Sequence, residues 1–171
     1  MEELKKHIRD IPNFPKEGII FRDITPLLQD AGAFRKAVDA MAEPVKDKGV
    51  RYIVGAEARG FIFASALAYR LGVGIVIVRK PGKLPYEKLN ASYALEYGTN
   101  VLEVHRDAIS SGHKILIVDD LLATGGTAAA IGDLVRRLGG EILGYSFLVE
   151  LTDLRGREKL EPYTVWSLIK Y

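Results

Sequence analysis

Apolar residues recur along the chain at two spacings, which predict strands and helices in alternation. Residues 52–54, 75–78 and 115–118 are short apolar runs, mostly β-branched, which is typical of strands buried on both faces of a parallel sheet. Helices with one apolar face are predicted over residues 33–48, 61–71 and 127–138, and further strands over residues 142–149 and 163–169. This order predicts an α/β fold of Rossmann-like type, with a central, mostly parallel sheet flanked by helices.

Other segments interrupt this alternation. Leu4, Ile8 and Ile11 are at helical spacing, which predicts a short amphipathic helix over residues 2–10 that ends before Pro12. Residues 13–28 contain two prolines, Pro15 and Pro26, and predict an irregular, partly extended loop.

The middle of the chain is predicted to hold a basic loop followed by a hairpin. Residues 79–90 contain Pro81, Gly82 and Pro85 together with four basic side chains, so a loop is expected. Two alternating stretches, residues 93–97 and 101–105, flank a short turn and predict a β-hairpin.

Composition narrows the possible partners. The 171 residues include 24 basic and 22 acidic side chains, and this near balance gives no reason to expect nucleic acid or a membrane surface. The absence of cysteine excludes disulfides, thiolate metal sites and cysteine nucleophiles. Because the chain has no secretory leader and no apolar run of about 18 residues, we expect a cytoplasmic protein.

The most informative segment is residues 115–127. Its apolar strand brings Asp119 and Asp120 to the carboxyl end of the sheet, where open α/β folds bind ligands. The following glycine-containing loop offers backbone N–H groups, two hydroxyls and a helix N-terminus, which favour a phosphate. Its residues are Ala123, Thr124, Gly125, Gly126 and Thr127. Carboxylates would repel a bare phosphate, so we expect them to face sugar hydroxyls or Mg²⁺, and a ribose 5-phosphate satisfies both halves of the site.

Residues 115–127 also allow a plainer interpretation, and they do not match the other common phosphate motifs. The segment could be an ordinary strand-to-helix turn in which Thr124 or Thr127 caps the helix. Gly126 is not followed by the lysine that a P-loop requires, and the only G-x-G, residues 72–74, precedes a strand and lacks its third glycine. The histidines are scattered, at positions 7, 105 and 113, which argues against a histidine metal site.

The string V-D-D-x-x-A-T-G-G-T at residues 118–127 resembles the signature with which type I phosphoribosyltransferases bind phosphoribosyl diphosphate. Four further segments resemble, in order and spacing, the members of that family that act on adenine: residues 14–26, 57–61, 79–85 and 93–98. The resemblance covers essentially the whole chain. It implies one domain, residues 1–171, with the type I phosphoribosyltransferase fold, in which residues 1–30 form a small hood and residues 79–105 a flexible loop and hairpin.

The resemblance also implies an activity. The 5-phosphoribosyl group of 5-phospho-α-D-ribose 1-diphosphate would pass to adenine, giving AMP and diphosphate in purine salvage. Mg²⁺ would accompany the substrate, held mainly by the diphosphate with no direct protein ligand. The family's habit, and the reach of the basic loop toward a neighbouring subunit, predict a homodimer.

Roles follow from the resemblance for individual residues. Asp119 and Asp120 would bind the ribose and act in catalysis, and residues 123–127 would bind the 5-phosphate. Diphosphate would be bound by Arg59, Arg79, Lys80 and Lys83, and adenine by Ile20, Phe21 and Arg22. Glu96 would accept the proton from the base, positioned with the help of Tyr97.

Several alternatives stay open at this point. Without the resemblance, Arg59 and the loop cations are ordinary solvated side chains, Phe21 is a core aromatic, and Glu96 is a surface glutamate. A non-catalytic protein that senses phosphoribosyl diphosphate is a second functional interpretation. A transferase for another base, such as xanthine or hypoxanthine, is a third.

Overall fold

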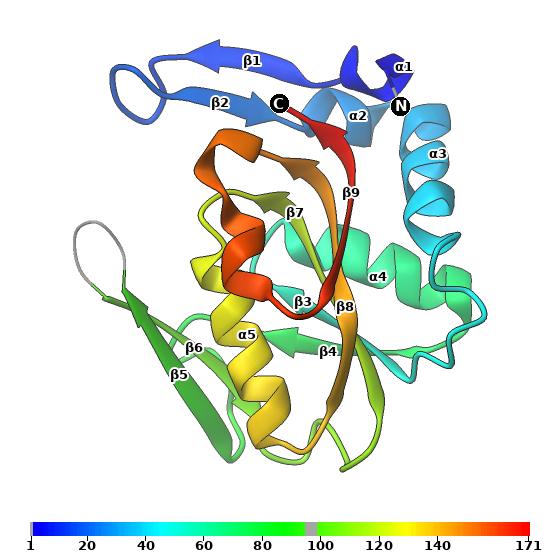
Figure 1. Ribbon diagram of the computed structural model, residues 1–171, viewed down its shortest axis with the longest axis vertical. Helices are drawn as coiled ribbons and strands as arrows, with labels where there is room; N and C mark the ends of the chain where they lie inside the picture. The colour runs from blue at the N-terminus through cyan, green and yellow to red at the C-terminus, as the bar shows by residue number, and fades with distance from the viewer. Residues whose placement is uncertain (1, 95–98) are drawn as a thin grey trace.

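The computed structural model describes residues 2–94 and 99–171, and its centre is a parallel sheet (Figure 1). The sheet has five strands in the order β4-β3-β7-β8-β9, and every neighbouring pair is parallel. The strands are β3 (Tyr52–Ala56), β4 (Gly74–Val78), β7 (Lys114–Leu122), β8 (Glu141–Glu150) and β9 (Thr164–Lys170). The predicted α/β fold with a central parallel sheet is therefore confirmed.

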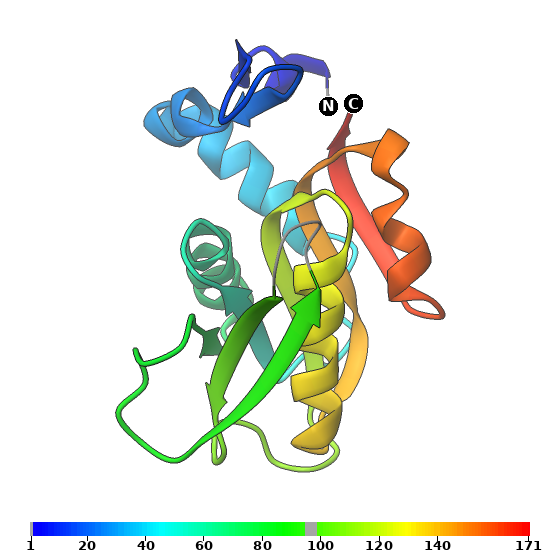
Figure 2. The same ribbon diagram turned by 90° about the vertical axis from the view of Figure 1, so that its left-hand side faces the viewer.

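Helices cover both faces of this sheet (Figures 1 and 2). On one face, α3 (Ala31–Ala42) and α4 (Gly60–Leu71) pack with Ile53 and Leu116 into one apolar cluster. On the other face, α5 (Gly126–Arg137) packs with Val54 and Ile117 into a second cluster. Successive side chains of β3 and β7 thus point into the two apolar clusters on opposite faces of the sheet. This explains why both strands are apolar without interruption. None of the helices in the described ranges is long and apolar enough to cross a lipid bilayer.

The edge strand β4 departs from the expectation of burial on both faces. Val76 and Val78 are buried, whereas Ile75 and Ile77 are 38% and 40% exposed. The reason is position, because β4 lies at the end of the sheet and has a strand neighbour on one side only.

The N-terminal segment forms the hood, and here the sequence prediction was partly wrong. The predicted helix over residues 2–10 ends early: α1 spans Glu2–Lys5, and β1 (Arg9–Pro12) pairs antiparallel with β2 (Ile20–Asp23). Ile11 faces Phe21 across this ladder, so tertiary pairing overrides its helical spacing. The predicted loop over residues 13–28 contains β2 and part of α2 (Thr25–Gln29). Figure 1 shows the hood lying across the end of the sheet at which β9 finishes.

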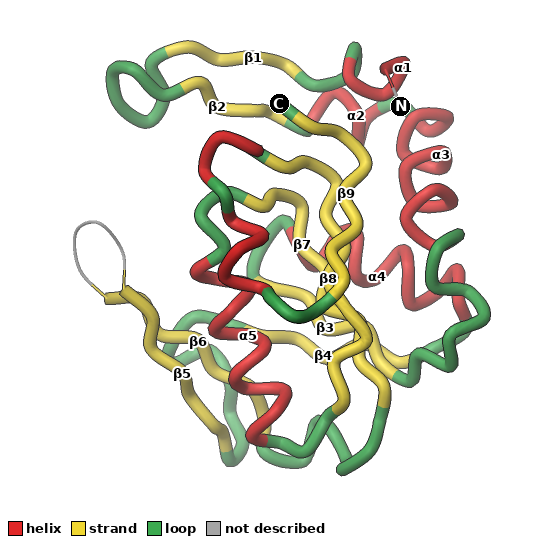
Figure 3. The backbone as a smooth tube through the Cα atoms, in the orientation of Figure 1, coloured by secondary structure: helices red, strands yellow, loops and turns green. Residues whose placement is uncertain are grey.

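Two further pieces flank the sheet on the side of α5. The predicted hairpin is present as β5 (Lys88–Ala94) and β6 (Thr99–His105), and its first strand begins five residues earlier than expected. Between β8 and β9 the chain makes two short 3₁₀ helices, η1 (Thr152–Leu154) and η2 (Gly156–Leu160), which are red in Figure 3. The sequence analysis assigned no element to this connection.

Candidate active site

A cavity of about 390 Å³ opens at the carboxyl end of β7, where the sequence predicted the ligand site. It lies between the end of β3, the start of α5 and the hairpin. It is lined by Glu57, Ala58, Arg59, Lys80, Tyr93, Asn100, Val101, Leu102 and residues 119–128. The two aspartates, Arg59, Lys80 and residues 123–127, called the phosphate loop after their predicted ligand, are therefore brought to one place.

Asp119 and Asp120 lie within β7, which continues to Leu122, although the sequence suggested that they follow the strand. Asp119 Oδ1 accepts a hydrogen bond from the Asp120 backbone N–H at 2.9 Å. The N-terminus of α4 packs closely behind it, since a Cβ at Gly60 would lie 2.6 Å from that same oxygen. Burial, followed by the charge of Asp120, raises the pKa of Asp119 well above its usual range.

Asp120 is the more deeply buried acid, with 5% of its surface exposed. Its Oδ2 lies 3.0 Å from Arg59 Nε as an ion pair but has no partner with hydrogen-bond geometry among the described residues. Burial raises the pKa of Asp120, and the Arg59 guanidinium opposes this shift. A buried carboxylate oxygen without a hydrogen bond is suited to accept one from a ligand hydroxyl.

The phosphate loop runs directly into α5. Gly125 is the N-cap residue with φ +79°, a left-handed conformation that favours glycine, and no side chain caps this helix. The capping interpretation of Thr124 and Thr127 is therefore wrong. Thr127 Oγ1 instead donates a hydrogen bond to the Tyr93 hydroxyl at 3.1 Å, and Asn100 Nδ2 donates to the same hydroxyl at 3.3 Å. Tyr93 and Asn100, which the sequence analysis did not assign, thus connect the hairpin to the loop.

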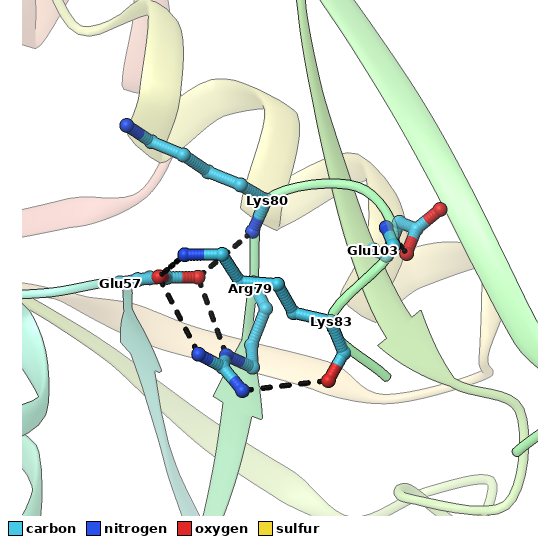
Figure 4. A network of polar contacts seen from close by, with 6 residues as sticks. Glu57, Arg79, Lys80, Lys83 and Glu103 are labelled. Atoms are coloured by element: carbon cyan, nitrogen blue, oxygen red, sulfur yellow. Dashed lines mark hydrogen bonds and ion pairs between the residues drawn. The ribbon is translucent and has the colours of Figure 1, made fainter. Parts of the chain in front are cut away.

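Glu57, at the end of β3, organises the basic loop (Figure 4). Its carboxylate, largely buried, accepts hydrogen bonds from Arg79 Nε at 3.2 Å, from the Lys80 backbone N–H at 3.1 Å, and from the Lys83 ammonium. The Lys83 hydrogen bond, with those of Lys80 and Arg79, lowers the pKa of Glu57 to about 2. No local pattern in the sequence predicts this role for Glu57, because its partners lie more than twenty residues away along the chain.

The three predicted loop cations are therefore not equivalent. Arg79 and Lys83 direct their side chains to Glu57, whereas the Lys80 side chain extends away from that carboxylate (Figure 4). Lys80 also lines the cavity, and Arg79 and Lys83 do not. Glu103 fixes the rest of the loop by accepting from the Gly82 N–H at 3.1 Å.

The predicted adenine residues lie in β2 of the hood. The Phe21 ring makes an edge contact with Phe14, with centroids 5.2 Å apart, and the Arg59 guanidinium carbon is 5.2 Å from the Phe21 centroid. The Arg22 side chain turns elsewhere, pairing with Asp10 and lying 3.8 Å over the Tyr171 ring. Ile20 is half exposed. Phe21 of the hood thus contacts Arg59, which in turn pairs with Asp120 in the cavity.

Glu96 and Tyr97, predicted to handle the proton of the base, lie outside the described residues.

Fold and site together are typical of one class: parallel α/β proteins in which paired carboxylates and a glycine-containing loop meet at the carboxyl end of the sheet. Residues 27–170 match the family model described as "Phosphoribosyl transferase domain". The chain is 60% identical to the adenine phosphoribosyltransferase of Halothermothrix orenii over 98% of its own length and 99% of that protein, and 57% identical to that of Thermotoga neapolitana over 99% of each. The chain therefore belongs to the phosphoribosyltransferase family, and within it to the adenine phosphoribosyltransferases.

Solved structures of adenine phosphoribosyltransferases have the same fold as this chain. The adenine phosphoribosyltransferase of Thermoanaerobacter pseudethanolicus has a TM-score of 0.97 at 55% identity, with 99% of each chain covered. That of Saccharomyces cerevisiae, solved with an imino-altritol bisphosphate and adenine, has a TM-score of 0.92 at 46% identity, with 97% of this chain and 96% of that chain covered.

Proposed function

We infer that this enzyme transfers the 5-phosphoribosyl group from 5-phospho-α-D-ribose 1-diphosphate to adenine, giving AMP and diphosphate. The observation that carries the inference is the single cavity in which Asp119, Asp120, residues 123–127 and Arg59 meet. The 60% sequence identity, over nearly the full chain, to proteins named adenine phosphoribosyltransferase supports the choice of adenine as the base.

The reaction replaces one bond at the anomeric carbon by another. A ring nitrogen of adenine forms the new C–N bond, the C–O bond to diphosphate breaks, and the transition state has oxocarbenium character. Positive charge grows on the ribose, which the carboxylates of Asp119 and Asp120 stabilise while they accept its hydroxyl protons in hydrogen bonds. The N–H groups of residues 124–127 hold the 5-phosphate at the start of α5.

The leaving group needs cations. Arg59 Nε lies 3.0 Å from Asp120 Oδ2, and this ion pair supports a role for the guanidinium at the boundary between the ribose and the diphosphate. We propose Lys80 as the loop's cation at the same cavity, because its side chain lines it. Arg79 and Lys83 contact the Glu57 carboxylate. Each would have to leave that carboxylate before it could bind a diphosphate, in this subunit or in a neighbouring one.

Magnesium would arrive with the diphosphate. The oxygens of Asp119 and Asp120 are donors that Mg²⁺ accepts, but no group of three or more acidic or histidine side chains in the described ranges surrounds a common point. We therefore propose an ion held mainly by the diphosphate and water, which would neutralise charge on the leaving group.

Adenine would bind beside Phe21, in contact with its ring face or edge. Strand β2 has β1 as its neighbour in a two-stranded ladder, so its second edge offers backbone groups to the purine. Adenine has an exocyclic amino group where hypoxanthine and guanine have a carbonyl, so a fixed carbonyl acceptor favours adenine. Glu96 stays the proposed acceptor for the proton that the base loses.

We propose that the enzyme acts as a homodimer in the cytoplasm. Large apolar side chains are exposed on α4 and β4, which contact each other: Ile62, Tyr69, Ile75 and Ile77. Large apolar side chains exposed on neighbouring elements favour association. The cytoplasm is proposed because the phosphorylated substrate and product do not cross membranes unaided.

A base panel tests the proposed function. The enzyme, phosphoribosyl diphosphate and Mg²⁺ are incubated separately with adenine, hypoxanthine, guanine and xanthine, and nucleotide and diphosphate are quantified by chromatography. We expect AMP from adenine, and a kcat/KM at least about a thousandfold lower for the 6-oxopurines because their carbonyl faces an acceptor.

Two results would contradict the proposal. Turnover of a 6-oxopurine in preference to adenine would indicate a transferase for another base. Binding of phosphoribosyl diphosphate without turnover of any base would indicate a sensor.

A further inference from the structure

The connection between β8 and β9, which contains η2, contacts the backbone of the phosphate loop at residues 123–125. A Cβ added to Gly156, the first residue of η2, would overlap the carbonyl oxygen of Ala123 and lie 3.0 Å from the Gly125 nitrogen. Conversely, a Cβ on Gly125 would overlap the Gly156 carbonyl oxygen. The two backbones are therefore in direct contact, and glycine on both sides makes this approach possible.

Gly156 is itself held in place by its neighbour Arg157. The Arg157 guanidinium makes a two-pronged contact with Glu150, with Nε–Oε1 at 2.5 Å and Nη2–Oε2 at 2.7 Å. It also donates to the Ser167 hydroxyl and to the Val165 carbonyl, each at 2.8 Å. Glu150 is buried at the end of β8, and Ser167 and Val165 belong to β9. Arg157 thus ties η2 to two strands of the central sheet.

We propose that Gly156 and Arg157 are positioning residues for the 5-phosphate. Through them, η2 packs against the backbone of residues 123–125 and holds it in the position that phosphate binding requires. This inference rests on the proposed function, since it assumes that the loop binds the phosphate of the substrate. Backbone N–H groups bind an anion well only when they are held in place, and packed interiors transmit a displacement of one segment to the next. Neither residue touches the cavity, so both act through the loop.

A pair of glycine variants tests the proposal. Gly156→Ala forces the loop and η2 apart, so the KM for phosphoribosyl diphosphate and the Kd for AMP are expected to rise about tenfold or more, with the KM for adenine within twofold of wild type. Gly74→Ala is the matched control, because its Cβ would also lie too close to a neighbour, 2.7 Å from the Tyr52 ring, but at the start of β4 and away from both the loop and the strands that hold Arg157. Both variants are expected to lower the thermal midpoint, and only the first to change the two phosphate-dependent constants.

A milder variant covers the case in which Gly156→Ala does not fold. Arg157→Lys keeps the charge and loses the two-pronged contact, so the KM for phosphoribosyl diphosphate is expected to rise about three- to tenfold. Arg70→Lys, at an exposed arginine that pairs with Asp39 at 2.7 Å, is its control.

The outcomes separate this proposal from the proposed function. Equal KM values for phosphoribosyl diphosphate in Gly156→Ala and Gly74→Ala, or in the two lysine variants, would overturn the positioning role while wild type still forms AMP. A wild-type protein that forms no AMP would overturn the proposed function itself.

Discussion

The kcat/KM for AMP formation is expected to fall about a thousandfold when Asp119 and Asp120 are both replaced by asparagine. Both carboxylates lie in the cavity, and Asp120 Oδ2 is buried without a hydrogen-bond partner among the described residues. Asparagine retains an oxygen acceptor but loses the negative charge that stabilises an oxocarbenium-like ribose. Initial rates at varied phosphoribosyl diphosphate and adenine measure the effect. Unchanged rates and affinities would show that the two aspartates have no role in binding or catalysis.

The stability of the same variant serves as its control. Burial raises the pKa of both aspartates above the value near 3.9 that they have in the unfolded chain. The folded state therefore binds more protons, and the carboxylates destabilise it increasingly as the pH rises above about 4. The double variant is expected to have a urea midpoint at pH 7 equal to or above that of wild type, and the difference should shrink toward pH 4. A lower urea midpoint than that of wild type at pH 7 would indicate that the double variant loses activity because its fold is destabilised.

The second large effect is expected at Arg59. Arg59→Ala should raise the KM for phosphoribosyl diphosphate about a hundredfold, because a guanidinium at the cavity is lost as a partner of the diphosphate. Its side chain is 40% exposed, so its removal leaves no cavity in a core. The variant also leaves Asp120 without its cation, so kcat is expected to fall as well.

Arg70→Ala is the control for Arg59→Ala. Arg70 is also an exposed arginine paired with an aspartate, Asp39, but it lies at the opposite end of α4. Its kinetic constants should stay within twofold of wild type. Equal effects of the two substitutions would show that Arg59 is a solvated surface residue.

The sheet and its flanking helices were predictable because burial determines their sequences. β3 and β7 are buried on both faces, and α3, α4 and α5 show one apolar face, so periodicity was sufficient to find these elements, although α3 ends at Ala42 and not at residue 48 as predicted. The hood was not predictable in the same way. Ile11 has helical spacing to Leu4 and Ile8, but the antiparallel partner that turns residues 9–12 into a strand lies around Phe21.

The site was predictable where chemistry is contiguous in sequence. Residues 119–127 carry the carboxylates and the phosphate loop together, and the structure keeps them at one cavity. Contacts between distant segments carry no local signal: the pairing of Glu57 with Arg79 and Lys83, the Tyr93–Thr127 hydrogen bond, and the packing of Gly156 on the loop. The sequence could therefore name the loop cations but not separate Lys80 from the two that Glu57 binds.

One cavity is expected to bind the ribose, its 5-phosphate and the base, and a crystal structure with AMP bound tests this most directly. We expect phosphate oxygens about 3 Å from the backbone nitrogens of residues 124–127, ribose hydroxyls hydrogen-bonded to Asp119 and Asp120, and the adenine ring against Phe21. A phosphate bound away from this loop, or ribose hydroxyls that do not contact either aspartate, would contradict the account.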